Sequence, residues 1–109
     1  MYPVEWIQLD DWYLKISQIG PFLISTKEIQ TGIEFRVYIF YSLEEHEVNN
    51  HCLKFYSLPI DTKKLEEVKI EVMKTLFYLI YNGSHGPIIF FKDVKKVVEK
   101  RIKIFLSNT

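Results

Sequence analysis

From residue 4 to residue 57, hydrophobic and polar side chains alternate with a period of two, the period of β-strands. The alternation is clearest over residues 33–41, where Ile33, Phe35, Val37, Ile39 and Tyr41 share one face and Glu34, Arg36, Tyr38 and Phe40 share the other. The pattern predicts strands over residues 4–9, 12–19, 22–29, 33–41 and 51–57, with a polar, acidic loop over 42–50. Asp10-Asp11 and Gln30-Thr31-Gly32 are short hairpin connections. We therefore expect an antiparallel meander.

After Pro59 the period changes to that of a helix, with Leu65, Val68, Val72, Leu76 and Leu79 forming one stripe. This predicts a helix over about 61–82 with Asp61 as its N-cap, and a second over about 93–106 capped by Asp93. The short apolar segment 88–91 between them reads as a strand or a connector. We expect a single α+β domain over residues 1–109: a four- to five-stranded antiparallel meander followed by two helices packed on one face.

The length of 109 residues and a hydrophobic share of 48% agree with one folded domain. A single cysteine excludes a disulfide framework. No apolar run approaches the roughly 20 residues that span a bilayer, and the N-terminus lacks a signal-peptide pattern. We expect a cytoplasmic protein that does not contact membranes. The lack of alanine and the abundance of residue types with AT-rich codons favour an AT-rich genome, that of an archaeon, thermophiles included, or its virus, or of a low-GC bacterium or its phages.

The formal net charge of zero conceals an uneven distribution. Residues 1–50 carry 3 basic and 8 acidic side chains, whereas residues 51–109 carry 11 and 6. Overall attraction to nucleic acid is thereby excluded, and any such binding needs a local basic face.

If helices cover the apolar face of the sheet, strand periodicity predicts the composition of the other face. Every Lys and Arg of the predicted strands falls on it, together with four aromatic rings. Bases of single-stranded DNA or RNA stack on aromatic rings, and Lys and Arg neutralise phosphates. The predicted nucleic-acid-binding residues are Tyr13, Lys15, Lys27, Arg36, Tyr38, Phe40, Lys54 and Tyr56.

Other interpretations of the same residues stay open. Aromatic residues are favoured in strands for packing alone, and a face covered by a partner subunit would also be aromatic. From Ile70 onward the first predicted helix is apolar nearly all round, so it needs cover on more than one side. A homodimer or another protein partner would supply that cover, with Met73, Phe77, Ile80 and Tyr81 in the interface. The outward residues of the second helix form a further basic surface: Lys95, Lys96, Lys100, Arg101 and Lys103.

Residue types suited to catalysis occur without the spacing that catalysis needs. The segment 44–52 contains Glu44, Glu45, His46, Glu47, His51 and Cys52, but no second pair of ligands that would complete a zinc site. His51 and Cys52 are adjacent in a strand and would point to opposite faces. The turn 82–87 carries Ser84 and His85 but lacks the lysine and spacing of a P-loop. We expect no metal, no cofactor and no enzymatic activity.

Overall fold

Strand β4 (Gly32–Tyr41) is the centre of an antiparallel sheet, between β3 (Ile19–Ile29) and β5 (Asn49–Ser57). The computed structural model describes residues 4–82 and 86–108. On one side of β4 the side chains of Ile33, Phe35, Val37 and Ile39 are buried. They meet Leu53 and Phe55 of β5 in the same core. The alternation predicted over residues 33–41 is confirmed.

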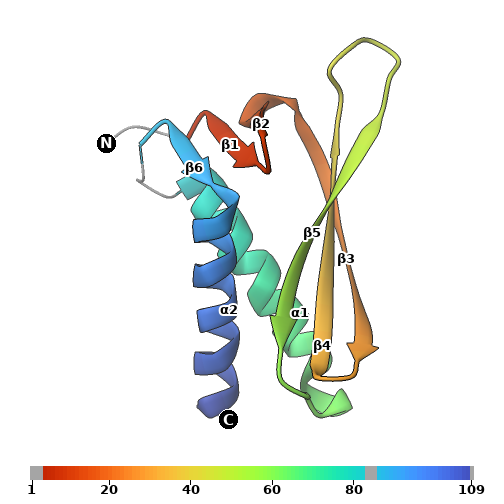
Figure 1. Ribbon diagram of the computed structural model, residues 1–109, viewed down its shortest axis with the longest axis vertical. Helices are drawn as coiled ribbons and strands as arrows, with labels where there is room; N and C mark the ends of the chain where they lie inside the picture. The colour runs from red at the N-terminus through yellow and green to blue at the C-terminus, as the bar shows by residue number, and fades with distance from the viewer. Residues whose placement is uncertain (1–3, 83–85, 109) are drawn as a thin grey trace.

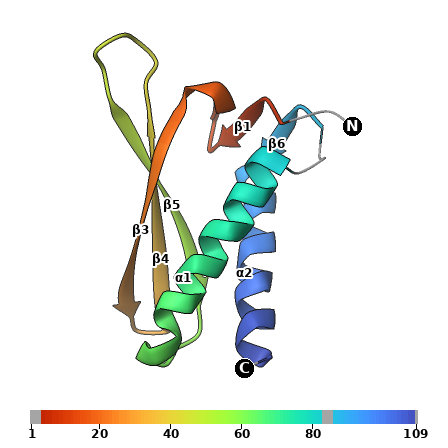
Figure 2. The same cartoon turned by 180° about the vertical axis from the view of Figure 1, so that it is seen from behind.

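Helices α1 (Thr62–Phe77) and α2 (Phe91–Ser107) cover this apolar face, as Figures 1 and 2 show from opposite sides. They bury one stripe each: Val68, Val72 and Leu76 on α1, and Val94, Val98 and Ile102 on α2. Asp61 is the N-cap of α1, as predicted, and its side chain accepts a hydrogen bond of 3.0 Å from the Lys63 N–H. None of the helices in the described part of the chain is both long and apolar enough to cross a membrane.

The second helix begins earlier than the sequence indicated. Its N-cap position is Phe90 and its first residue is Phe91, so Asp93 lies within the first turn and is not the cap. A carboxylate in the first turn still interacts favourably with the helix dipole. The aspartate was therefore a correct marker of the helix start, displaced by less than one turn.

A second, smaller sheet contains the N-terminal hairpin. Strands β1 (Trp6–Leu9) and β2 (Trp12–Lys15) pair through the predicted Asp10-Asp11 turn, where Asp10 has a φ of +45°. Strand β6 (Ile88–Phe90) pairs parallel to β1, while the 3₁₀ turn Ile16–Gln18 separates β2 from β3. The α+β class is confirmed. The strands divide into two three-stranded sheets, in place of the predicted single meander of four or five.

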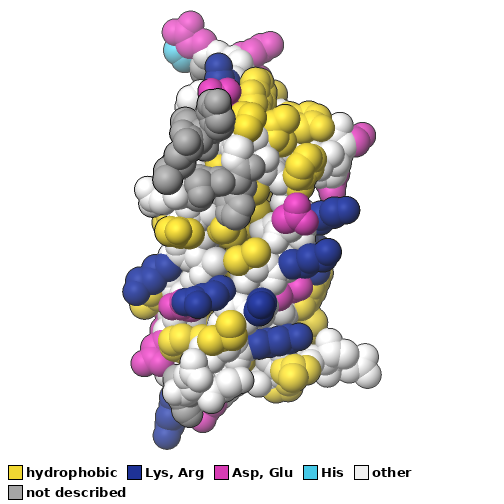
Figure 3. Space-filling model, turned by 90° about the vertical axis from the view of Figure 1, so that its left-hand side faces the viewer, with side chains coloured by type: hydrophobic (Ala, Val, Ile, Leu, Met, Phe, Trp, Pro, Cys, Tyr) yellow, Lys and Arg dark blue, Asp and Glu magenta, His cyan; other side chains and the backbone are white. Residues whose placement is uncertain are grey.

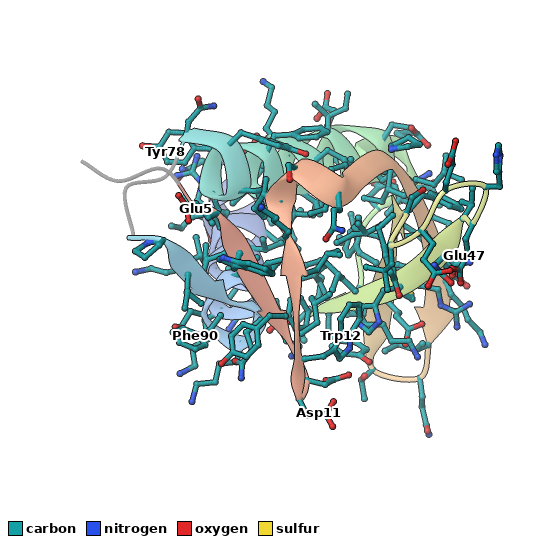
Figure 4. All side chains as sticks on the ribbon, turned by 90° about the horizontal axis from the view of Figure 1, so that it is seen from above. Glu5, Asp11, Trp12, Glu47, Tyr78 and Phe90 are labelled. Carbon is teal, nitrogen blue, oxygen red and sulfur yellow. The ribbon has the colours of Figure 1, made fainter. Side chains whose placement is uncertain are left out.

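Trp12 joins the two sheets. Its ring centroid lies 5.5 Å from that of Tyr41 and 5.6 Å from that of His51, both on the larger sheet. Figure 4 shows Trp12 on the side of β2 that faces β5. Asn49 of β5 is paired with Tyr41 of β4. The side-chain nitrogen of Asn49 is buried and has no hydrogen-bond partner among the described residues.

The last turn of the first helix is wider than an α-helical turn. Residues Tyr78–Asn82 form a π-helical turn that continues α1. Within this turn, Ile80 lies in the core, where it is 1% exposed, and Tyr78 and Tyr81 lie at the surface. The prediction that Ile80 lies in a dimer interface is therefore wrong: Ile80 follows the buried Leu76 by four residues and shares its side of the helix. The predicted turn containing Ser84 and His85 falls on residues 83–85, outside the described residues.

Gly32 begins β4 where the chain has no room for a side chain. Its φ is +154°, and a Cβ built on it would lie 1.9 Å from the carbonyl oxygen of Ser57. Both the backbone conformation and the close approach to β5 need glycine.

We predict that Gly32→Ala destabilises the protein by about 3 kcal/mol or more, because strand β5 must move to admit the methyl group. The matched control is Gly20→Ala, whose Cβ would meet its nearest atom at 3.4 Å. That substitution should change the free energy of unfolding by no more than about 1 kcal/mol. Urea denaturation followed by circular dichroism compares the two. Equal effects would contradict this account of Gly32.

Candidate functional site

The face of the larger sheet that turns away from the helices combines aromatic and charged side chains. The register places Tyr38 between Leu23 and Cys52, Arg36 between Ser25 and Lys54, and Glu34 between Lys27 and Tyr56. Phe40 lies opposite Asn50 at the end of the sheet nearest the 42–48 loop. We call these residues the open sheet face: Leu23, Ser25, Lys27, Glu34, Arg36, Tyr38, Phe40, Asn50, Cys52, Lys54 and Tyr56.

The open sheet face gathers six of the eight residues that the sequence singled out for nucleic-acid contact. They come from three strands: Lys27 from β3; Arg36, Tyr38 and Phe40 from β4; Lys54 and Tyr56 from β5. Tyr56 and Lys54 are exposed, while Tyr38 and Phe40 are partly covered by their neighbours. The other two, Tyr13 and Lys15, belong to β2 in the smaller sheet and do not share this surface.

An ion pair occupies the middle of the open sheet face. The Arg36 Nε donates to Glu34 Oε1 at 2.5 Å, between residues two apart on one side of β4. Glu34 is 8% exposed, the one charged residue among the described positions that is buried. Arg36 is therefore already engaged by a carboxylate. The alternation of side chains along the strand predicted that Glu34 lies on this face, but it did not indicate that Glu34 pairs with Arg36.

The same pair sets the protonation of Glu34. The hydrogen bond from Arg36 holds the pKa of the Glu34 carboxyl below its usual value, against an opposing effect of burial. The charges of Arg36, Lys54 and Lys27 lower this pKa further. Three cations thus surround one carboxylate, which leaves this part of the face with an excess of positive charge.

Helix α2 adds a cation at the β5 edge. Lys95 Nζ lies 5.2 Å from the centroid of the Tyr56 ring, and Glu99 pairs with Lys95 at 3.3 Å. The Glu99 carboxylate also accepts a hydrogen bond of 2.7 Å from the backbone N–H of Tyr56. The sequence placed Lys95 on a separate helix surface, because a helix-to-strand contact cannot be read from the period of either element.

Tyr13 and Lys15 lie on a different aromatic surface, the outer face of the smaller sheet. There, Trp6 stands between Lys15 and Ile88, and Gln8 stands between Tyr13 and Phe90. Lys15 Nζ lies 5.8 Å from the centroid of the Trp6 ring. Figure 4 shows Phe90 at the β6 edge of this sheet. The sequence signal that was missed is the alternation of these exposed residues with the buried Ile7 and Ile89.

The helices present their own charged surface. Figure 3 shows the helical side of the molecule, where Lys and Arg side chains stand among exposed hydrophobic ones. Lys96, Lys100, Arg101 and Lys103 of α2 are exposed, as their spacing predicted. Arg101 also pairs with Glu71 of α1 at 3.2 Å, which ties the two helices together.

Among the described residues, no three His, Cys, Asp or Glu side chains lie close enough to hold a metal ion. His51 is on the inner side of β5 and touches Trp12, while its neighbour Cys52 is on the open sheet face beside Tyr38. The two side chains therefore point to opposite sides of the sheet. Comparison with known proteins adds no further assignment, since no family model, no curated protein and no solved structure matches this chain.

The Glu34–Arg36 pair predicts a specific pH dependence of stability. A carboxyl whose pKa is lowered by folding stabilises the folded state above its unfolded pKa, here about 4.5, and this contribution disappears as the pH falls through the folded value. We expect Glu34→Gln to be less stable than the parent protein near neutral pH, with the difference shrinking below about pH 4.5.

Urea unfolding at a series of pH values measures this difference. The exposed Glu67→Gln variant controls for the loss of one negative charge. A difference between Glu34→Gln and the parent that stays constant from neutral to acidic pH would contradict the assignment.

Proposed function

We propose that this protein is a non-enzymatic binding protein that holds single-stranded DNA or RNA on the open sheet face. The observation that carries the proposal is the register, which gathers Lys27, Arg36 and Lys54 with the rings of Tyr38, Phe40 and Tyr56 on a face that α1 and α2 do not cover. Flat, aromatic and basic surfaces bind single strands because bases stack on rings and phosphates pair with cations.

The rings are arranged along the sheet in a way that suits successive bases. Tyr38 and Phe40 are two residues apart on β4, which separates them by about 7 Å on the same face. Tyr56 is the most exposed of the three rings, and it lies at the β5 edge beside Lys95. Each stacked base contributes about 1–3 kcal/mol and needs no particular sequence. The proposal is therefore one of binding without base specificity.

The cations limit how strongly phosphate is held. Arg36 is paired with Glu34 and Lys95 with Glu99, which leaves Lys27 and Lys54 as the cations of the face most available to a phosphate. Each phosphate contact with a single strand contributes a slope of about −0.7 to the dependence of log K on log salt concentration. Two such contacts give an expected total slope of about −1.4, and hence binding that is measurable at low salt and weak at high salt.

The stacking part of the proposal is tested by replacing two rings. Tyr38→Ala and Tyr56→Ala should each weaken binding of a fluorescein-labelled oligonucleotide by roughly tenfold, as measured by fluorescence anisotropy at low salt. Tyr78→Ala, at the exposed end of the first helix, removes an equivalent ring elsewhere and should bind as the parent does. Circular dichroism verifies that all three variants are folded. No binding by the parent protein at low salt would overturn the proposal.

The electrostatic part is tested by two substitutions with opposite effects. Lys54→Gln should reduce the magnitude of the salt slope by about 0.7, because it removes one phosphate contact. Glu34→Gln should increase it by up to a similar amount and tighten binding at low salt, because it releases Arg36. Lys100→Gln, on the outward side of α2, is the matched control. Weaker binding by Glu34→Gln would contradict the arrangement of charges described above.

A second candidate function is that of a homodimeric protein-interaction or structural factor. It is favoured by an aromatic cluster at the end of α1, where the Phe77 ring centroid lies 5.0 Å from that of Phe22 and 5.9 Å from that of Tyr81. Phe77 and Tyr81 are exposed, and Met73 is partly exposed. Burial raises the pKa of the Tyr81 phenol above its usual value, in keeping with a partly apolar environment. The cytoplasmic location expected from the sequence stays a prediction under both candidates.

A further inference from the structure

The two edges of the larger sheet differ in what lies beside them. At the β5 edge, Glu99 of α2 accepts the Tyr56 N–H. At the other edge, β3 pairs with β4 on one side and with no strand of the described chain on the other. β3 is 11 residues long, and its pairing with β4 is continuous from Phe22 to Ile29. An edge strand of this length offers a row of backbone N–H and C=O groups to another strand.

Helix α1 carries a second apolar stripe next to this edge. Ile70, Met73 and Phe77 recur at spacings of three and four residues, on a different side of the helix from the buried stripe. They line a shallow groove with Ile24 of β3, and Ile70 is 57% exposed. Figure 2 shows α1 crossing this side of the sheet, with β3 as the outermost strand. The free strand edge and the apolar helix stripe therefore belong to one continuous surface.

Two of the three charged residues that line this groove, Glu66 and Lys74, lie at equal distances along α1 from Ile70; the third is Lys69. Glu66 lies one helical turn before Ile70 and Lys74 one turn after it, and both line the groove. When two α1 helices pack antiparallel about a two-fold axis at Ile70, residue 66 of each copy faces residue 74 of the other. Glu66 then meets Lys74 twice. A surface that matches itself under a two-fold rotation is the requirement for an isologous dimer.

We propose that a second copy of this chain docks on this surface, with the two β3 strands pairing antiparallel and the two α1 helices packing through Ile70, Met73 and Phe77. The inference rests on the homodimer named above as the second candidate function, and it needs no nucleic acid. The strand pairing joins two three-stranded sheets into one of six strands. Both open sheet faces then lie on the same side of the joined sheet, because a two-fold axis perpendicular to a sheet keeps each face on its own side.

The self-complementary charges favour a second copy over an unrelated partner. A different protein could bind the groove with any arrangement of complementary charges. Only a two-fold contact between identical chains requires Glu66 and Lys74 to lie at equal distances from Ile70. The intrahelical contact of Lys69 with Glu66, at 2.9 Å, keeps the carboxylate at the groove border in the free chain.

The oligomeric state of the purified full chain, measured by light scattering and sedimentation without oligonucleotide, tests the inference. We expect a dimer. Ile70→Glu should weaken dimerisation by roughly a hundredfold or more, because it buries two facing carboxylates at the axis. Ile104→Glu is the matched control, an exposed isoleucine on the outer side of α2, and should leave the dimer intact.

A charge exchange tests the symmetry directly. Glu66→Lys and Lys74→Glu should each weaken the dimer, and the double variant should recover it, since the two pairs are restored with reversed sign. Hydrogen exchange should show slower exchange of β3 backbone amides as protein concentration rises.

The measurements distinguish failure of the homodimer in general from failure of the specific β3 and α1 interface. A parent protein that is monomeric at high concentration overturns both the homodimer and this interface. A dimer that is unaffected by Ile70→Glu, or one whose β3 amides gain no protection, overturns this interface alone. Because these measurements contain no nucleic acid, their outcome does not depend on whether the proposed oligonucleotide binding is correct.

Discussion

The structure depends on the burial of one side of strand β4. Ile33, Phe35, Val37 and Ile39 fill the space between the sheet and the two helices. Because successive side chains of a strand point to opposite faces, this burial determines the position of every other residue of β4 as well. Glu34, Arg36, Tyr38 and Phe40 lie on the opposite face as a consequence, and the register with β3 and β5 brings their neighbours alongside. A slip of one residue would move both Glu34 and Arg36 into the apolar core and bring Phe35 and Val37 to the opposite face, which makes alternative registers costly.

The composition of the open sheet face reflects a balance between charge and burial. Glu34 is nearly enclosed by its neighbours, and a carboxylate in that position needs a cation. Arg36 supplies it on the same strand, while Lys27 and Lys54 lie across from them on the flanking strands. The pair therefore holds the middle of the face in a defined arrangement and leaves the lysines at its sides. Stability and the capacity to attract anions are properties of the same few side chains.

Much of this arrangement could be predicted from the sequence, and the rest depends on contacts that periodicity does not report. The alternation over residues 33–41, the Asp10-Asp11 hairpin and the Asp61 cap are local signals, and the structure agrees with each. The transfer of β1 and β2 to a separate sheet was not predicted, because their partner β6 lies about 80 residues away along the chain and is only three residues long. Ile80 was misplaced because the helix end is apolar nearly all round, which hides the buried stripe that Ile80 continues four residues after Leu76. The proximity of Lys95 to Tyr56 depends on how α2 docks against β5, which no single element encodes.

The hydrogen bond from the Tyr56 N–H to Glu99 has a consequence for the size of any assembly. Sheets that are open at both edges can add strands without limit, and such growth ends in fibres. Here a side chain of the protein's own helix takes one N–H of the β5 edge, whereas no strand of the described chain pairs with the outer edge of β3. In the proposed dimer, the β3 strands of the two chains pair with each other, so neither β3 edge is left for a third chain. Glu99 thus makes the β5 edge a poorer template for a further strand than the β3 edge, which favours a finite complex over a polymer.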